Sequence, residues 1–117
     1  MNAHIDRVVL ARLCHDLGGD KASVGRFAGK FVSHWCERAA RLEKALGRSD
    51  ASEAGVVLLS IRTTSSMLGA VHLEAESALM LGALSRCDFA GCRLSLSSLT
   101  RIGDETCLEL TELFRSA

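Results

Sequence analysis

Residues 20–47 read DKASVGRFAGKFVSHWCERAARLEKALG, and this stretch decides the fold. Its apolar residues recur at intervals of three and four, which is the repeat of one face of an α-helix. Asp20 stands where an N-cap residue accepts hydrogen bonds from the first free amides, and Gly47 stands where a helix ends. The stretch therefore predicts one long amphipathic helix. Its apolar positions are Val24, Phe27, Phe31, Trp35, Ala39, Leu42 and Leu46.

Helical signals continue on both sides of this stretch. A short helix is expected to begin after Asp6 and to end at Gly18. Asp50 and Glu53 have the spacing of a capping box, so a third helix is expected to begin there and to end at Gly69. The buried stripe of this third helix is predicted to contain Ala54, Leu58, Ile61, Ser65 and Leu68.

Two further helices are expected in the C-terminal part of the chain. A fourth should occupy residues 71–83, and Asp88 can cap a fifth. Gly103 lies inside the fifth and lowers its intrinsic stability by about 1 kcal/mol relative to alanine. The apolar side of the fourth helix is predicted to include Val71, Ala75, Ala78 and Leu79.

The composition agrees with a helical protein. The chain has 117 residues, 48% of them hydrophobic and 4% aromatic, and it has no proline to interrupt a helix. Because the expected connections are short, neighbouring helices should run antiparallel. The predicted fold is all-α: an antiparallel up-down four-helix bundle with a short additional N-terminal helix, in a single domain over residues 1–117.

Several functions are made improbable by the same numbers. Lys plus Arg and Asp plus Glu each total 14, so no net charge favours a nucleic acid or an anionic membrane surface. No apolar run is long enough to span a membrane, and the N-terminus lacks the pattern of a signal peptide. The five cysteines are irregularly spaced and are predicted to be reduced, mostly buried thiols. We expect a cytoplasmic protein with no metal and no cofactor.

Charge is unevenly distributed along the neutral chain. Residues 20–48 carry seven basic and three acidic groups, a net charge of +4, whereas residues 71–117 carry four basic and seven acidic groups, a net charge of −3. Surface charges of this kind usually pair with neighbouring helices in solvent. The alternative is that the basic helix is a docking strip for an acidic partner.

The candidate binding site is the side of the third helix that faces away from the core. At about 100° per residue, Leu59, Arg62, Thr63 and Ser66 share one face. Leu59 should therefore be exposed, with Gly55 and Thr63 one turn to either side leaving a low surface around it. No residue of this face is expected to be catalytic.

The segment at residues 50–70, DASEAGVVLLSIRTTSSMLGA, resembles the central helix of histidine-containing phosphotransfer (HPt) domains of bacterial phosphorelays. The motif of that family runs approximately His-x-Leu-Lys-Gly-Ser-x-x-x-x-Gly-Ala. Ile61 matches its leucine, Arg62 its basic residue, residues 63–66 its small polar stretch, and Gly69 with Ala70 its closing pair. The resemblance extends outward to Ile5, Asp6, the LGGD turn at residues 17–20, Phe27, Phe31, Arg41 and Leu42.

Two positions depart from the family motif. Leu59 occupies the place of the phosphorylated histidine, and an alkyl side chain has no nucleophile to accept a phosphoryl group. Thr63 replaces the usual glycine and adds a branched side chain beside that place. Arg62 keeps the positive charge that family members use near the phosphoryl group.

The resemblance implies an HPt-like protein that has lost its phosphoacceptor. Such a protein would act as a non-catalytic adaptor for a response-regulator receiver domain or a hybrid histidine kinase, and it would not be an enzyme. Two alternatives remain open. The chain could transfer phosphate through another histidine, among which His15, His34 and His72 are expected to be ordinary surface or packing residues. It could also be a helical homo-oligomer, a homodimer for example, that uses the exposed Leu59.

Overall fold

The computed structural model describes residues 4–115 of the chain, and five α-helices account for most of them. No strand is formed within these residues; Ile5 and Ala70 make one isolated antiparallel bridge. None of the described helices is both long and apolar enough to cross a membrane. The helices are α1 (Arg7–Asp16), α2 (Lys21–Gly47), α3 (Ala51–Leu68), α4 (Val71–Ser85) and α5 (Phe89–Arg115).

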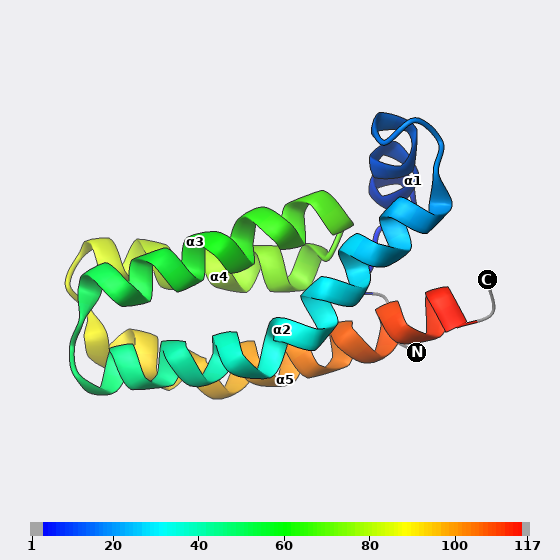
Figure 1. Cartoon of the computed structure of the whole chain (residues 1–117). Helices are drawn as coiled ribbons and strands as arrows, with labels where there is room; N and C mark the ends of the chain where they lie inside the picture. The colour runs from blue at the N-terminus through cyan, green and yellow to red at the C-terminus, as the bar shows by residue number, and fades with distance from the viewer. Residues whose placement is uncertain (1–3, 116–117) are drawn as a thin grey trace.

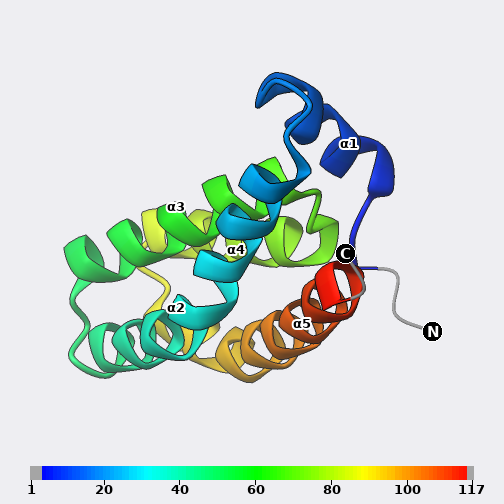
Figure 2. The same ribbon diagram turned by 45° about the vertical axis from the view of Figure 1, so that its right-hand side comes forward.

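Helices α2 to α5 form an antiparallel bundle in which each helix packs beside two others (Figure 1). The contacts run from α2 to α3, from α3 to α4, from α4 to α5 and from α5 back to α2. Helix α1 lies at one end of the bundle, against α2 and α3 (Figure 2). The all-α bundle with a short additional N-terminal helix, expected from the sequence, is confirmed.

The predicted caps are present at the starts of the first three helices. Asp6, Asp20 and Asp50 each accept a hydrogen bond from a backbone amide of the following first turn, over distances of 3.0 Å. The reciprocal half of the expected capping box is wrong. The Glu53 side chain does not return to the Asp50 amide; it accepts hydrogen bonds from Nε and Nη2 of Arg41, at 3.1 and 2.9 Å.

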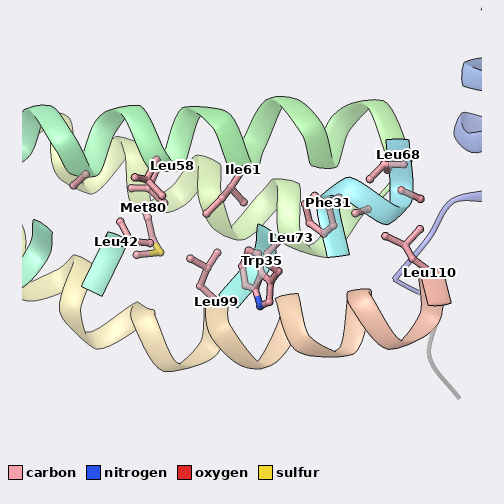
Figure 3. Packing of buried hydrophobic residues seen from close by; sticks show 14 of the residues in the cluster. Phe31, Trp35, Leu42, Leu58, Ile61, Leu68, Leu73, Met80, Leu99 and Leu110 are labelled. Carbon is pink, nitrogen blue, oxygen red and sulfur yellow. The ribbon is translucent and has the colours of Figure 1, made fainter. Parts of the chain in front are cut away.

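The core lies between the four bundle helices (Figure 3). All five residues of the predicted stripe on α3 are buried, and the stripe on α2 is buried except at Phe27 and Ala39, which are half-buried. Phe31 and Trp35 of α2 stack with ring centroids 6.0 Å apart. Labelled side chains from α2, α3, α4 and α5 point toward one another in Figure 3. These helices therefore bury the faces that their 3.6-residue repeats indicate.

The predicted face of α4 is wrong. Its buried residues are Leu73, Ser77, Met80 and Leu84, whereas Leu79 is 70% exposed and Val71 is 37% exposed. Apolar residues occur on every side of this helix, so their spacing alone does not select the side that packs. The side of α4 that is buried is set by its contacts with α3 and α5.

Gly103 does not interrupt α5, which is continuous from Phe89 to Arg115. The glycine lies directly against the indole ring of Trp35, and a Cβ atom at residue 103 would overlap that ring. Trp35 is 2% exposed, and its Nε1 donates a hydrogen bond to Oδ1 of Asp104 at 2.9 Å. The glycine that lowers the intrinsic stability of the fifth helix is therefore the residue that makes room for the Trp35 ring between α2 and α5.

Residues 4–6 run across the turn between α3 and α4. The Asp6 amide donates to the Gly69 carbonyl at 2.7 Å, and the Val71 amide donates to the His4 carbonyl at 3.0 Å. Gly69 has a φ of 74°, and a Cβ atom there would lie 2.6 Å from the Asp6 carbonyl oxygen. This position thus needs glycine both for its left-handed conformation and for the close approach of the N-terminal segment.

We expect Gly69→Ala to lower the free energy of unfolding by more than Gly18→Ala does. Gly18 has a similar φ of 78° but has open space around it, so alanine there costs only the left-handed conformation, about 1–2 kcal/mol. At Gly69 the methyl group would also displace the Asp6 backbone. Urea unfolding of both variants measures the difference, and equal losses would contradict the proposed contact.

Candidate functional site

The outward side of α3 carries four exposed residues that we call the Leu59 face: Leu59, Arg62, Thr63 and Ser66. Leu59 is 54% exposed, although the adjacent Leu58 is fully buried. The 100° step of the helix accounts for this contrast, since it turns Leu58 toward the core and Leu59 toward solvent. The structure therefore brings together these four residues as the sequence predicts.

Two further apolar side chains extend the Leu59 face along α3. Val56 is 58% exposed and Met67 is 43% exposed. Helical spacing places both within about 80° of Leu59 on the same side of α3. With Leu59 they form an apolar strip about 16 Å long, given the rise of 1.5 Å per residue. The sequence analysis missed Val56 and Met67, although the periodicity used to find Leu59 also identifies them.

Gly55 lies at the edge of this surface. It is half-buried, and a Cβ atom there would lie 3.7 Å from Cδ2 of Leu84 on α4. The glycine therefore lies where α3 and α4 meet, one turn before Leu59.

The chemistry available on the Leu59 face is limited to contact and charge. Arg62 has no salt bridge to any residue in the range 4–115, so its guanidinium is available to a partner. Neither Thr63 nor Ser66 hydrogen-bonds to a histidine or carboxylate among the described residues, and an unassisted hydroxyl is a weak nucleophile. The face can bind a partner through an apolar strip with a positive charge at its side.

The basic character of α2 is partly neutralised by a carboxylate on α3 and by the carboxylate at its own N-cap. Arg41 pairs with Glu53 of α3 at 2.9 Å, and both side chains remain partly exposed. Arg26 lies 3.8 Å from Asp20 and donates to the Ser23 hydroxyl at 2.9 Å. Such exposed pairs contribute little to stability. Arg38 is half-buried, whereas the exposed lysines of α2 are free to act on an approaching partner: Lys21, Lys30 and Lys44.

Hydrogen-bonded side chains connect three separate parts of the fold near the C-terminal end of α3: α5, the N-terminal segment and the start of α4. Oε1 of Glu105 on α5 lies 2.9 Å from Nε2 of His4, and Nδ1 of His4 lies 3.0 Å from Nδ1 of His72 on α4. The Glu109 carboxylate accepts from the amides of His4 and Ile5 at 2.9 and 3.2 Å. The His4 side chain is only 10% exposed, whereas His72 is exposed.

One arrangement of protons satisfies both contacts with neutral rings. A carboxylate at Glu105 accepts from Nε2–H of His4, which leaves a lone pair on Nδ1 of His4. Nδ1–H of His72 donates to that lone pair, which leaves the lone pair of His72 on Nε2. The sequence analysis missed this cluster because His4 and Glu105 are 101 residues apart.

The remaining histidines and the cysteines form no comparable group. The His15 side chain is 91% exposed and His34 is exposed, which agrees with their expected surface placement. The expectation of mostly buried thiols is wrong, since only Cys92 is fully buried and Cys36 and Cys87 are exposed. Burial raises the pKa of the Cys107 thiol to about 12. Within residues 4–115, no three His, Cys, Asp or Glu side chains lie close enough together to hold a metal ion.

Comparison with known proteins gives one informative result. The sequence matches no protein family model and no curated protein. The structure is similar to the crystal structure of histidine-containing phosphotransfer protein B from Pseudomonas aeruginosa PAO1, with a TM-score of 0.88 and 20% sequence identity. The similarity covers 100% of this chain and 99% of that chain. The chain therefore has the helical bundle fold of a histidine-containing phosphotransfer protein.

Proposed function

We propose that this chain is a phosphotransfer-like docking protein of a phosphorelay, which binds a receiver domain or a hybrid histidine kinase and does not carry phosphate itself. The observation that carries the proposal is an exposed leucine on α3 at the place that the HPt motif gives to the phosphorylated histidine. The shared fold over the whole chain supports the same conclusion.

The chemistry of Leu59 accounts for the loss of transfer. A phosphoryl group passes from an aspartyl phosphate to a histidine when a ring nitrogen attacks phosphorus, and an alkyl side chain has no lone pair. Thr63, one turn away and exposed, puts a branched side chain where the motif has glycine. Binding can continue without the histidine and the glycine of the motif, because the apolar strip and Arg62 remain.

The Leu59 face has the composition of a small docking surface. Apolar anchors that lose water on binding supply most of the affinity at such surfaces, and charges at the rim mainly raise the association rate. Val56, Leu59 and Met67 are the available anchors, and Arg62 is the rim charge. The net charge of +4 on residues 20–48 would favour a partner with an acidic surface.

We expect Leu59→Asp to weaken binding to a receiver domain by roughly 2 kcal/mol, which is the cost of removing a central apolar anchor. Arg62→Glu should mainly slow association and should do so less at high salt. Titration of each variant against receiver domains of the same organism measures both effects. Leu79→Asp and Arg12→Glu are matched controls, since they change an exposed leucine and an exposed arginine on other helices.

Circular dichroism should show all four variants folded, because every altered side chain is exposed. Affinity that is unchanged by Leu59→Asp would remove this face as the docking site. Sedimentation at several concentrations separates docking from self-association. A dimer that Leu59→Asp dissociates would assign the face to a second copy of the chain instead.

A second candidate function is phosphotransfer through His72. The hydrogen bonds that connect Glu105 to His4 and His4 to His72 favour it. His72 Nε2 would attack the phosphorus of an acyl phosphate, forming an N–P bond as the P–O bond to the carboxylate breaks. The ring becomes positively charged in this step, and its Nδ1–H, held by His4 and Glu105, would spread that charge. Leu59 lies about 14 Å of helix rise from the end of α3, so one docked receiver would not serve both sites.

The second candidate predicts an acid-labile phosphate on His72 after incubation with an acetyl-phosphate-charged receiver domain. His72→Gln should abolish the signal, and His4→Gln should reduce its rate because the ring loses its partner. His15→Gln and His34→Gln are controls, since both histidines are exposed and outside the hydrogen-bonded chain. If wild-type protein acquires no phosphate, the docking function stands without it.

A further inference from the structure

Helix α1, the first turns of α2 and the last turn of α5 lie at the end of the bundle opposite the α2–α3 connection (Figures 1 and 2). Side chains of these three segments line a groove. Its volume is about 880 Å³. The apolar floor contains Leu10, Cys14, Val24, Leu113 and Phe114. Val24 is 2% exposed, so the floor is closed by packed side chains and continues into the core.

The charged residues that line this groove are all basic: Arg7 on α1, and Lys21 and Arg26 on α2. Arg26 lies 3.8 Å from Asp20, whereas Arg7 and Lys21 make no salt bridge with any residue between 4 and 115. Arg7 and Lys21 therefore leave a net positive charge beside the apolar floor, although the whole chain has a net charge of zero.

A second groove of the molecule does not have this purely basic lining. The groove between α2 and α5 has a similar volume, about 850 Å³, but carries charges of both signs. Glu43, Asp104 and Glu105 line it together with Arg93 and Arg101. The groove between α2 and α5 therefore favours neither cations nor anions. The groove beside α1 favours an anion that also has an apolar part.

The placement of the cations indicates what kind of anion fits. Arg7 lies on one wall of the groove, and Lys21 and Arg26 lie on the other, about 7.5 Å apart along α2. A fatty acid has its single charge at one end and can meet only one of these positions. A peptide segment can place an apolar anchor on the floor and carboxylates on both sides of it, as helices bound in grooves do.

We propose that this groove binds an acidic amphipathic segment of a partner protein. A large apolar side chain of that segment contacts Leu10, Val24 and Phe114, and its carboxylates pair with Arg7, Lys21 and Arg26. The groove lies on α1, α2 and α5, whereas the Leu59 face lies on α3. The inference does not rest on the proposed receiver docking, because the groove contains none of the residues of the Leu59 face.

Selection of short helical peptides from a random display library tests the chemistry of the groove. We expect the selected peptides to carry several Asp or Glu residues around a Leu, Phe or Trp, and their affinity to fall with salt. The doubly changed Lys21→Glu, Arg26→Glu protein should bind them at least roughly tenfold more weakly, a change of 1.4 kcal/mol. Arg12→Glu with Arg48→Glu makes the same change of net charge outside the groove and should have a small effect.

Ala11→Trp tests the apolar floor, since Ala11 is exposed and lines the groove, so a large ring there fills it. Ala90→Trp places the same ring on an exposed site of α5 outside the groove. Loss of peptide binding in the first variant alone supports the proposal. Basic or neutral selected peptides, equal loss in the two charge variants, or saturable binding of decanoate with no binding of acidic peptides would each overturn it. Leu59→Asp should leave peptide binding unchanged, which separates this result from the receiver experiment.

Discussion

Gly103→Ala should be among the most destabilising single-methyl additions in this protein. The added Cβ would overlap the indole ring of Trp35, which is 2% exposed and stacked on Phe31. Overpacking a filled core costs about 1–3 kcal/mol, and we expect a loss near the top of that range because the obstacle is a rigid ring. Movement of the ring would also break its hydrogen bond to Asp104. Urea unfolding measures the loss.

Gly29→Ala is the matched control for this variant. Gly29 also lies inside a long helix, α2, and nothing lies within 4 Å of the position of its absent Cβ. Alanine there should stabilise the protein by about 0.5–1 kcal/mol, because it lowers the entropy of the unfolded chain. Opposite signs for the two substitutions would locate the cost at Gly103 in the contact with Trp35. A stabilising Gly103→Ala would show that the ring can move aside.

Fluorescence gives an independent view of the same contact. Trp35 is the only tryptophan, so its emission should shift to longer wavelength if the ring is pushed toward solvent. Trp35→Phe should make Gly103→Ala less costly, because the smaller ring leaves room for the methyl group. A double-mutant cycle followed by circular dichroism measures this coupling, which contacting residues show and distant residues do not.

The buried faces of α2 and α3 could be predicted from the sequence, whereas that of α4 could not, for a physical reason. Helix α2 has one apolar side, and on α3 the buried residues recur every three or four positions, so the residue spacing identified both buried stripes. Helix α4 is apolar on all sides, and its packing face depends on contacts with α3 and α5 that no local pattern contains. The role of Gly103 in α5 also lies outside the local sequence, because it depends on Trp35, 68 residues earlier in the chain.

The same distinction applies to the candidate site, since some of its residues lie on one helix and others come from separate parts of the fold. Leu59, Arg62, Thr63 and Ser66 lie on one helix, so their common exposure followed from helical geometry alone. The hydrogen-bonded chain of Glu105, His4 and His72 joins α5, the N-terminal segment and α4, and only the folded structure brings these side chains together. Sequence reasoning can identify a site on one element, but it has no signal for a site assembled from three.

The remaining large effect is a gain of function. Leu59→His together with Thr63→Gly should produce a protein that accepts phosphate from a charged receiver domain, where Leu59 itself offers no acceptor. Residue 59 is on an exposed face, so a histidine there can reach solvent and a docked partner. Leu59→His alone should accept phosphate from the receiver roughly tenfold more slowly, equivalent to about 1.4 kcal/mol of barrier, because Thr63 obstructs close approach. Acid-labile labelling measures both rates.

Phosphoramidate separates chemistry from docking in these variants. It is a small donor that needs no protein partner, so it should label position 59 equally in the single and double variants. A difference seen only with the receiver would assign the effect of Thr63 to docking. Leu79→His supplies the control, because it places a histidine at another exposed leucine, on α4, and should react with phosphoramidate but not with the receiver.

The outcomes of this experiment decide what Leu59 does on its face of α3. Efficient transfer by Leu59→His alone would mean that Thr63 does not obstruct docking and that one side chain removed the activity. Labelling of the double variant by phosphoramidate but by no receiver domain would contradict receiver docking at this face, since the nucleophile would be present and the partner would not reach it. Transfer by the double variant and not by Leu79→His would place the receiver on the Leu59 face, because an aspartyl phosphate must come within bonding distance of the new ring nitrogen.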